Sequence, residues 1–282
     1  VAILVNPERS DLVDDLLDAL GDGGVQLIEP DGADALEAAV ADVVGSVDVV
    51  AAIGGDGTQR TVASVLKGSQ TALAVVPGGT VNLLSRVLGM TSVGVVAAAI
   101  RSGNRRTIDT GLVDGDTFVL NASTGYDAAV IRRVDDGAKR WGRLGYFMTG
   151  VRTLWTQRSR HVEVTIDGET FFSGRAMTVM VTNVPQRGSA DFELALGGSL
   201  DDGLLDVVVQ RCDSVFTMAR ALWALRRKHT PRTDDLVIGH GRTIDVSWSE
   251  PVAAQRDGDA TAMVTEAHHV VDVGSLTVCI PD

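Results

Sequence analysis

Residues 47–58, Val-Asp-Val-Val-Ala-Ala-Ile-Gly-Gly-Asp-Gly-Thr, contain an apolar run that ends in a glycine-rich turn. The run at 47–53 is almost continuously apolar, which is typical of a strand covered on both faces. After the turn, apolar residues at 62, 65 and 66 have the spacing of a helix. The order strand, glycine turn, helix predicts a unit of a parallel sheet, and ligands bind at the carboxyl edge of such sheets.

The segments on either side repeat this alternation. Apolar runs at 1–5, 25–28 and 72–76 predict further strands, and the residues at 12–20, 33–44 and 83–87 predict helices. We therefore expect an α/β domain with a mostly parallel sheet over residues 1–107, with the C-terminal tail 276–282 as a segment that could return to it.

From residue 108 onward the pattern changes to strands separated by short turns. We expect these strands at 117–121, 161–166, 176–182, 204–210, 243–248 and 270–280. Turns such as Asp167-Gly168 and Asp202-Gly203 separate them, and helices are expected at 142–155 and 215–227. The sequence predicts a mostly-β sandwich domain over 108–275.

A second glycine loop, Pro77-Gly78-Gly79-Thr80-Val81-Asn82, also follows a strand and precedes a helix. Both glycine loops can therefore open onto one sheet edge, where backbone N–H groups approach phosphate closely. Asp56 would repel a phosphate unless Mg²⁺ stood between them, so the pattern favours metal-assisted phosphoryl transfer. Thr80 could donate a hydrogen bond to a phosphate oxygen or could be only a helix cap, and either loop could be only a structural turn.

Composition restricts the class of partner. The net charge of −12 argues against nucleic acid, whose phosphates are held by clustered Lys and Arg. Cys212 and Cys279 are too few for a disulfide framework, and no apolar run reaches the length of a membrane span. We expect a cytoplasmic protein that is peripheral to the membrane when it acts.

The two glycine loops in this order resemble the catalytic domain of the diacylglycerol kinase and sphingosine kinase family, in particular its bacterial soluble lipid kinases. The similarity continues through 108–111, 121–127, 142–149, 201–206 and 257–259. The resemblance implies a NAD-kinase-like first domain that binds ATP, a β-sandwich that holds the lipid, and an active site in the cleft between them. It also implies transfer of the γ-phosphoryl group to the hydroxyl of a diacylglycerol-like or sphingoid lipid.

Carried over to this chain, the resemblance assigns three kinds of site residue. The positions expected around the nucleotide are Asn6, Arg9, Gly54, Gly55, Asp56, Gly57, Thr58, Gln59, Arg60, Gly79, Thr80 and Asn82. Asp56 would join an Asp–water–Mg²⁺ network, and the segment with Asp257 and Asp259 would supply the general base. A second, structural Mg²⁺ would be held by Asp202 with oxygens at Ser199 and Leu204. A homodimer is a further expectation.

Two other functions remain open at this point. A NAD kinase shares the first glycine loop and a similar two-domain plan. A catalytically weak sensor of nucleotide or lipid is the other alternative, because the loop at 6–11 departs from the family pattern, as does Arg60. That loop carries Glu8 and Asp11, which bring negative charge toward the expected ATP pocket.

Overall fold

The computed structural model divides the chain into two compact units. The N-terminal unit comprises Val1–Thr110 with Val273–Asp282, and the C-terminal unit comprises Gly111–Asp272. The structure describes residues 1–5, 11–21, 24–79, 82–135, 149–150, 152–153, 158–184, 199–211 and 236–282. Two predicted helices lie outside these residues: the one at 215–227 entirely, and the one at 142–155 except for four residues. The predicted site positions Asn6, Arg9 and Thr80 also lie outside them.

The N-terminal unit alternates strands and helices. Its elements are β1 (Ala2–Val5), α1 (Asp11–Leu20), β2 (Gln26–Ile28), α2 (Ala33–Val43), β3 (Val49–Gly54), α3 (Asp56–Leu66), β4 (Ala72–Pro77), α4 (Leu83–Val87) and α5 (Val93–Ser102). The strands pair in the order β2-β1-β3-β4 and all of these pairings are parallel. The C-terminal end of β16 (Val264–Cys279) adds to β4, also in parallel, through Val278 and Leu73.

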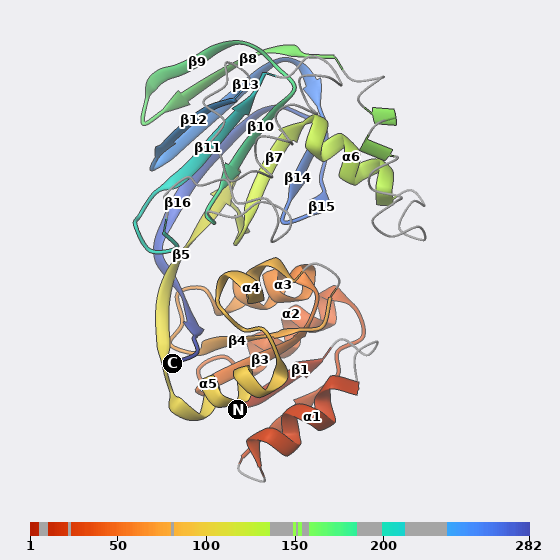
Figure 1. Cartoon of the computed structure of the whole chain (residues 1–282), viewed down its shortest axis with the longest axis vertical. Helices are drawn as coiled ribbons and strands as arrows, with labels where there is room; N and C mark the ends of the chain where they lie inside the picture. Colours follow the sequence, from red (N-terminus) through yellow and green to blue (C-terminus); the bar gives the residue numbers. More distant parts are fainter. Residues whose placement is uncertain are drawn as a thin grey trace. The chain divides into compact units, whose positions relative to one another are not determined.

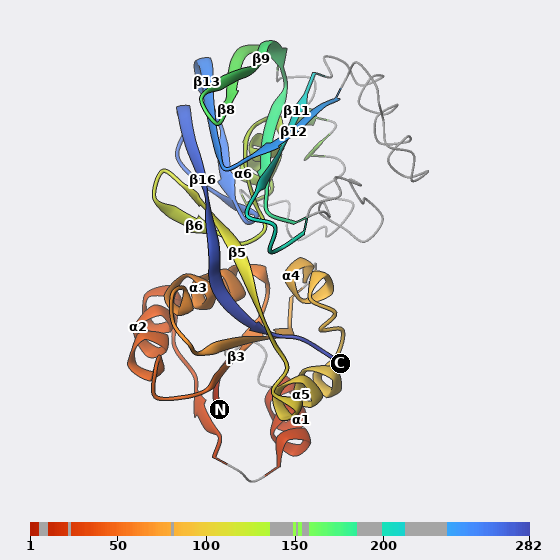
Figure 2. The same ribbon diagram turned by 90° about the vertical axis from the view of Figure 1, so that its left-hand side faces the viewer.

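Helices cover both faces of this sheet. Helix α1 packs against α5 and α2 packs against α3, and the two pairs lie on opposite faces (Figures 1 and 2). Every residue of β3 is buried, as are Ala72–Val76 of β4. Double coverage explains why these strands read as continuous apolar runs, and the predicted α/β domain with a mostly parallel sheet is confirmed.

The C-terminal unit is built almost entirely of strands. After β5 (Arg105–Val113), which begins in the N-terminal unit, its elements are β6 (Asp116–Phe118), β7 (Asn121–Gly125), α6 (Tyr126–Asp135), β8 (Arg160–Ile166), β9 (Glu169–Ala176), β10 (Thr178–Thr182), β11 (Leu205–Gln210), β12 (Leu236–Gly241), β13 (Thr243–Val252), β14 (Ala254–Arg256), β15 (Asp259–Ala260) and most of β16. One sheet has the order β12-β11-β10-β7-β14-β15, and the other contains β16-β13-β8-β9 (Figure 1).

Apolar side chains from both sheets form one core. It includes Val162 and Val246, which come from β8 and β13 of one sheet, and Val179 and Val207, which come from β10 and β11 of the other sheet. Side chains of the two sheets therefore face each other, and the predicted β-sandwich is confirmed.

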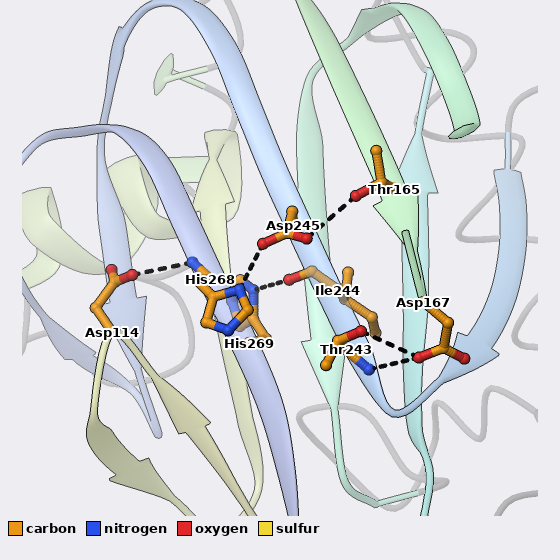
Figure 3. Close-up of polar contacts among 8 residues, drawn as sticks. All are labelled: Asp114, Thr165, Asp167, Thr243, Ile244, Asp245, His268 and His269. Carbon is orange, nitrogen blue, oxygen red and sulfur yellow. Dashed lines mark hydrogen bonds and ion pairs between the residues drawn. The ribbon is translucent and has the colours of Figure 1, made fainter. Parts of the chain in front are cut away.

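A polar side chain, that of Asp167, bonds to the chain where β8 ends and β13 begins (Figure 3). The predicted turn Asp167-Gly168 joins β8 to β9 with both residues at positive φ, 51° and 84°. The Asp167 carboxylate accepts hydrogen bonds from the N–H groups of Arg242 and Thr243 at 2.9 and 2.8 Å. These bonds, that from Thr243 first, lower the pKa of Asp167.

His269 of β16 is buried beside β13. Its Nδ1 donates to the carbonyl of Ile244 at 3.1 Å, and its ring meets Phe118 edge-on (Figure 3 shows the first contact). Burial lowers the pKa of His269 to about 4, so the ring is neutral in the folded protein near pH 7.

Candidate active site

The two glycine loops of the N-terminal unit are in direct contact. The N–H of Gly78 donates to the carbonyl of Gly54 at 3.1 Å. A Cβ on Gly79 would lie 2.6 Å from the Cα of Gly55, and one on Gly78 would lie 3.0 Å from the nitrogen of Gly54. Glycine at 79, and to a smaller degree at 78, therefore lets the two loops lie against each other at the ends of β3 and β4. This is the shared sheet edge that the sequence predicted.

Asp56 is the first residue of α3, and its carboxylate reaches the start of another helix. Its Oδ1 accepts a hydrogen bond from the N–H of Leu84 at 3.3 Å, and the N–H groups of Asn82 and Leu83 also interact with the carboxylate. Burial raises the pKa of Asp56, although these N–H groups act in the opposite direction. Asp56 therefore links the first glycine loop to α4, the helix that follows the second loop.

Asn82 holds the second loop in shape. It has a left-handed backbone with φ of 52°, its Oδ1 accepts from the Gly79 N–H at 2.7 Å, and its Nδ2 donates to the Gly79 carbonyl at 2.8 Å. An Asn side chain that closes its own loop in this way has both ends of its amide in use. Both of these side-chain contacts of Asn82 are thus with its own loop.

Gln59 lies beneath the loops and is fully buried. Its Nε2 donates to the carbonyls of Gly54 and Val76, at 3.2 and 3.3 Å, and so ties the end of β3 to β4. Gly57, Thr58 and Arg60 follow Asp56 on α3, and a Cβ on Gly54 would lie 2.6 Å from the Thr58 side chain.

In the C-terminal unit, Asp257 and Asp259 lie on one tight hairpin between β14 and β15. Asp257 is 7% exposed, and its carboxylate accepts three backbone hydrogen bonds of 2.8–2.9 Å from the N–H groups of Val119, Leu120 and Asn121. Asp259, two residues further along, is exposed. The two acids therefore have different surroundings: the first organises the chain between β6 and β7, and the second faces solvent.

The three bonds to Asp257 also correct a sequence prediction. A single strand was expected at 117–121, but β6 ends at Phe118 and β7 begins at Asn121. The N–H groups of 119–121 bond to the carboxylate, so they are not available to continue one ladder. A distant side chain therefore divides the predicted strand.

A polar network supports the hairpin, and sequence reasoning missed its central residue, Gln255. Its Nε2 donates to Asn121 Oδ1 and to Ser123 Oγ, both at 2.8 Å, and its Oε1 accepts from the Gly258 N–H at 2.8 Å. Ser123 in turn donates to Asp127 at 2.9 Å. The resemblance over 121–127 pointed to this segment, but a lone glutamine belongs to no motif.

The predicted second metal position is a loop closed on Asp202. The Asp202 carboxylate accepts from the N–H groups of Ser199 and Leu204, at 2.9 and 3.0 Å. Burial first, and then the charge of Asp202, raise the pKa of Asp206 to about 6. Both carboxylate oxygens of Asp202 thus bond to its own loop, and the Mg²⁺ at this position stays a prediction. Among the described residues no three His, Cys, Asp or Glu side chains cluster as metal ligands.

Comparisons with known proteins cover both units. Residues 6–113 match the family model described as the diacylglycerol kinase catalytic domain, and residues 121–280 match the YegS C-terminal NAD kinase beta sandwich-like domain. No helix in the described part of the chain is long and apolar enough to cross a membrane.

Named relatives agree with these matches. A diacylglycerol kinase of Bacillus subtilis is 30% identical over 200 residues, which is 70% of this chain and 65% of that protein, just under two thirds of its length. A diacylglycerol kinase of Mycobacterium tuberculosis is 27% identical over 248 residues, 84% of this chain and 79% of that protein.

A solved structure of a diacylglycerol kinase from Bacillus anthracis superposes with a TM-score of 0.75 at 18% identity, covering 99% of this chain and 96% of that one. An NAD kinase from Archaeoglobus fulgidus gives 0.56 at 11% identity, covering 100% and 93%. At these identities both structures show a common fold. The family models, one of which spans more than half of the chain, show more: this chain belongs to the family of the diacylglycerol kinase catalytic domain and its YegS-type C-terminal domain.

Proposed function

We propose that this protein is an ATP-dependent lipid kinase that transfers the γ-phosphoryl group to the hydroxyl of a diacylglycerol-like or sphingoid lipid. The observation that carries the proposal is that both units match one kinase family, including the segments that bear Asp56 and the pair Asp257 and Asp259. Relatives named diacylglycerol kinase support the acceptor class.

The N-terminal unit would hold the nucleotide. The glycine loops after β3 and β4 present backbone at the carboxyl edge of the sheet, where phosphates bind. We assign Asn82 and Gln59 to building these loops, because their amides bond to loop carbonyls and N–H groups. Thr58, Arg60 and the positions Asn6, Arg9 and Thr80 remain proposed nucleotide contacts.

Asp56 would face the metal that accompanies ATP. Its buried carboxylate has a raised pKa, so a nearby cation would favour the charged form, and carboxylate oxygen is a ligand that suits Mg²⁺. When bound, the ion would neutralise charge that develops on the phosphates. Asp202 is the proposed carboxylate ligand of a second, structural ion.

Asp259 is the proposed acceptor of the lipid hydroxyl proton. A general base must be reachable by its substrate, and Asp257 is only 7% exposed, with a carboxylate that accepts three backbone hydrogen bonds. Asp259 is exposed on the same hairpin, at a position that the network of Gln255 and Gly258 fixes. We therefore assign the base to Asp259 and a positioning role to Asp257.

The direct test is label transfer from γ-labelled ATP with Mg²⁺. Acceptors would be diacylglycerol, monoacylglycerol and sphingoid bases in mixed micelles, with NAD as a separate acceptor. The proposal predicts label in a chloroform-soluble product and none on NAD. Label on NAD would favour the dinucleotide kinase, and nucleotide binding without transfer would favour a sensor. We place the reaction at a membrane surface because the acceptor is a lipid.

A further inference from the structure

A cavity of about 250 Å³ in the C-terminal unit is lined by three arginines and lies outside the hairpin that carries Asp257 and Asp259. Arg132 and Arg133 come from α6, and Arg160 is the first residue of β8. None of the described residues that line the cavity is acidic, although the whole chain has a net charge of −12. Three positive charges therefore lie at this place, one of which, Arg160, is paired with Glu250.

The fold brings these arginines to one wall for definite reasons. Ala129, Arg132 and Arg133 stand at positions i, i+3 and i+4 of α6, which lie on the same helix face. A small residue at 129 leaves room beside the two guanidinium groups, and Ala129 packs with Ala128 and Ala253. Arg160 reaches the cavity from the adjoining sheet.

Two of the guanidinium groups are oriented by protein contacts. Arg133 donates to Thr153 Oγ1 at 3.0 Å, and Thr153 is fully buried. Arg160 pairs through Nε with Glu250 at 3.2 Å. A guanidinium group is planar and carries its N–H donors in a fixed fork, a geometry that matches phosphate oxygens in pairs.

The rest of the lining is apolar. Val252, Ala253 and Pro251 come from the end of β13 and the residue after it, and Met263, which is 50% exposed, stands at the rim. The volume is below the roughly 300–1,000 Å³ of sites for drug-sized molecules. A cationic wall with a small apolar wall suits a phosphate carried on a short carbon group.

We propose that this arginine cavity binds a phosphate ester of the glycerophosphate type, either as the head group of an anionic phospholipid or as a soluble ester. Three permanently charged guanidinium groups match the charge and the oxygens of a phosphate, and Pro251, Val252 and Ala253 match its carbon part. The site belongs to the C-terminal unit alone and does not depend on the proposed kinase activity.

The test uses the full chain and two kinds of probe. Glycerol 3-phosphate and inorganic phosphate would be titrated by calorimetry, and vesicles of phosphatidylcholine with or without phosphatidic acid would be used in flotation. Arg132→Gln should weaken binding about tenfold, because it removes one charge-assisted contact. Arg242→Gln is the matched control: it removes the same charge from an exposed position at the opposite end of β13.

A second pair of variants leaves every arginine in place. Met263→Glu brings a carboxylate to the rim and should weaken binding about tenfold, whereas Met263→Gln should leave it unchanged. Binding of the soluble esters with this pattern identifies a free phosphate ester, and the same pattern with vesicles alone identifies a lipid head group. No binding to any probe, or equal effects of each variant and its control, would overturn the proposal.

Discussion

Replacing Asp257 by asparagine should destabilise the C-terminal unit, whereas the same change at Asp259 should not. In the folded protein Asp257 Oδ1 accepts from the N–H groups of Leu120 and Asn121, and Oδ2 accepts from that of Val119. An asparagine keeps one oxygen for the first two donors. Its NH₂ group would then face the Val119 N–H, donor against donor.

The magnitude follows from these contacts. Hydrogen bonds to a charged group contribute about 1.5–3 kcal/mol each, and a buried donor without an acceptor costs about 1–3 kcal/mol. Asp257 is only 7% exposed, so water replaces little of the loss. We expect Asp257→Asn to lower the free energy of unfolding by about 3 kcal/mol, which corresponds to roughly 6–12 °C in Tm for a domain of this size.

The assay is thermal and urea unfolding of the full chain, followed by circular dichroism. Asp259→Asn is the matched control, since it makes the same chemical change two residues away on an exposed side chain, where substitutions usually stay within about 0.5 kcal/mol. Equal melting temperatures for the two variants would refute the structural role of Asp257. They would also remove the argument that assigns the base to Asp259.

Three further outcomes are expected. Lowering the pH from 7 to 5 should reduce the free energy of unfolding by about 2 kcal/mol through His269, because its folded pKa of about 4 lies below the unfolded value of 6.5 and the unfolded chain takes up the proton first. In urea unfolding measured across this pH range, His269→Gln should make the free energy of unfolding depend less on pH. An unchanged dependence on pH in this variant would contradict the prediction. Gly79→Ala should destabilise the N-terminal unit by about 1–3 kcal/mol in thermal melts, because the new Cβ would lie 2.6 Å from the Cα of Gly55. The control Gly94→Ala places a Cβ with nothing within 4 Å and should not destabilise this unit. Asp202→Asn should lower the pKa of Asp206 from about 6 while burial keeps it above the ordinary value, as carboxyl NMR titration can show; no change would mean that the two carboxylates do not interact.

Much of the N-terminal unit could be predicted from the sequence because its structure is local. The run at 47–53 is apolar because helices cover both faces of the sheet, and α1 ends before Gly21, which has a φ of 77°. The predicted helix after the first glycine loop begins inside the motif, at Asp56.

Other features depend on distant contacts and could not be read in the same way. The division of 117–121 into two strands depends on Asp257, whose carboxylate bonds to residues far from it in sequence. Gln59 was assigned to the nucleotide by resemblance, but the side chain is buried between strand ends. Strands β14 and β15 have three and two residues, too few for any periodicity to appear.

The rate of phosphoryl transfer from ATP to a diacylglycerol, measured for the wild-type protein and for Asp259→Asn under the same conditions, tests the central claim most directly. We predict transfer by the wild-type protein and a loss of about 10²–10⁴-fold in Asp259→Asn, with unchanged folding and Mg·ATP binding, because only proton acceptance is removed. Transfer by Asp259→Asn at the wild-type rate would contradict the assignment of the base, and no transfer by the wild-type protein to any lipid would contradict the proposed function itself.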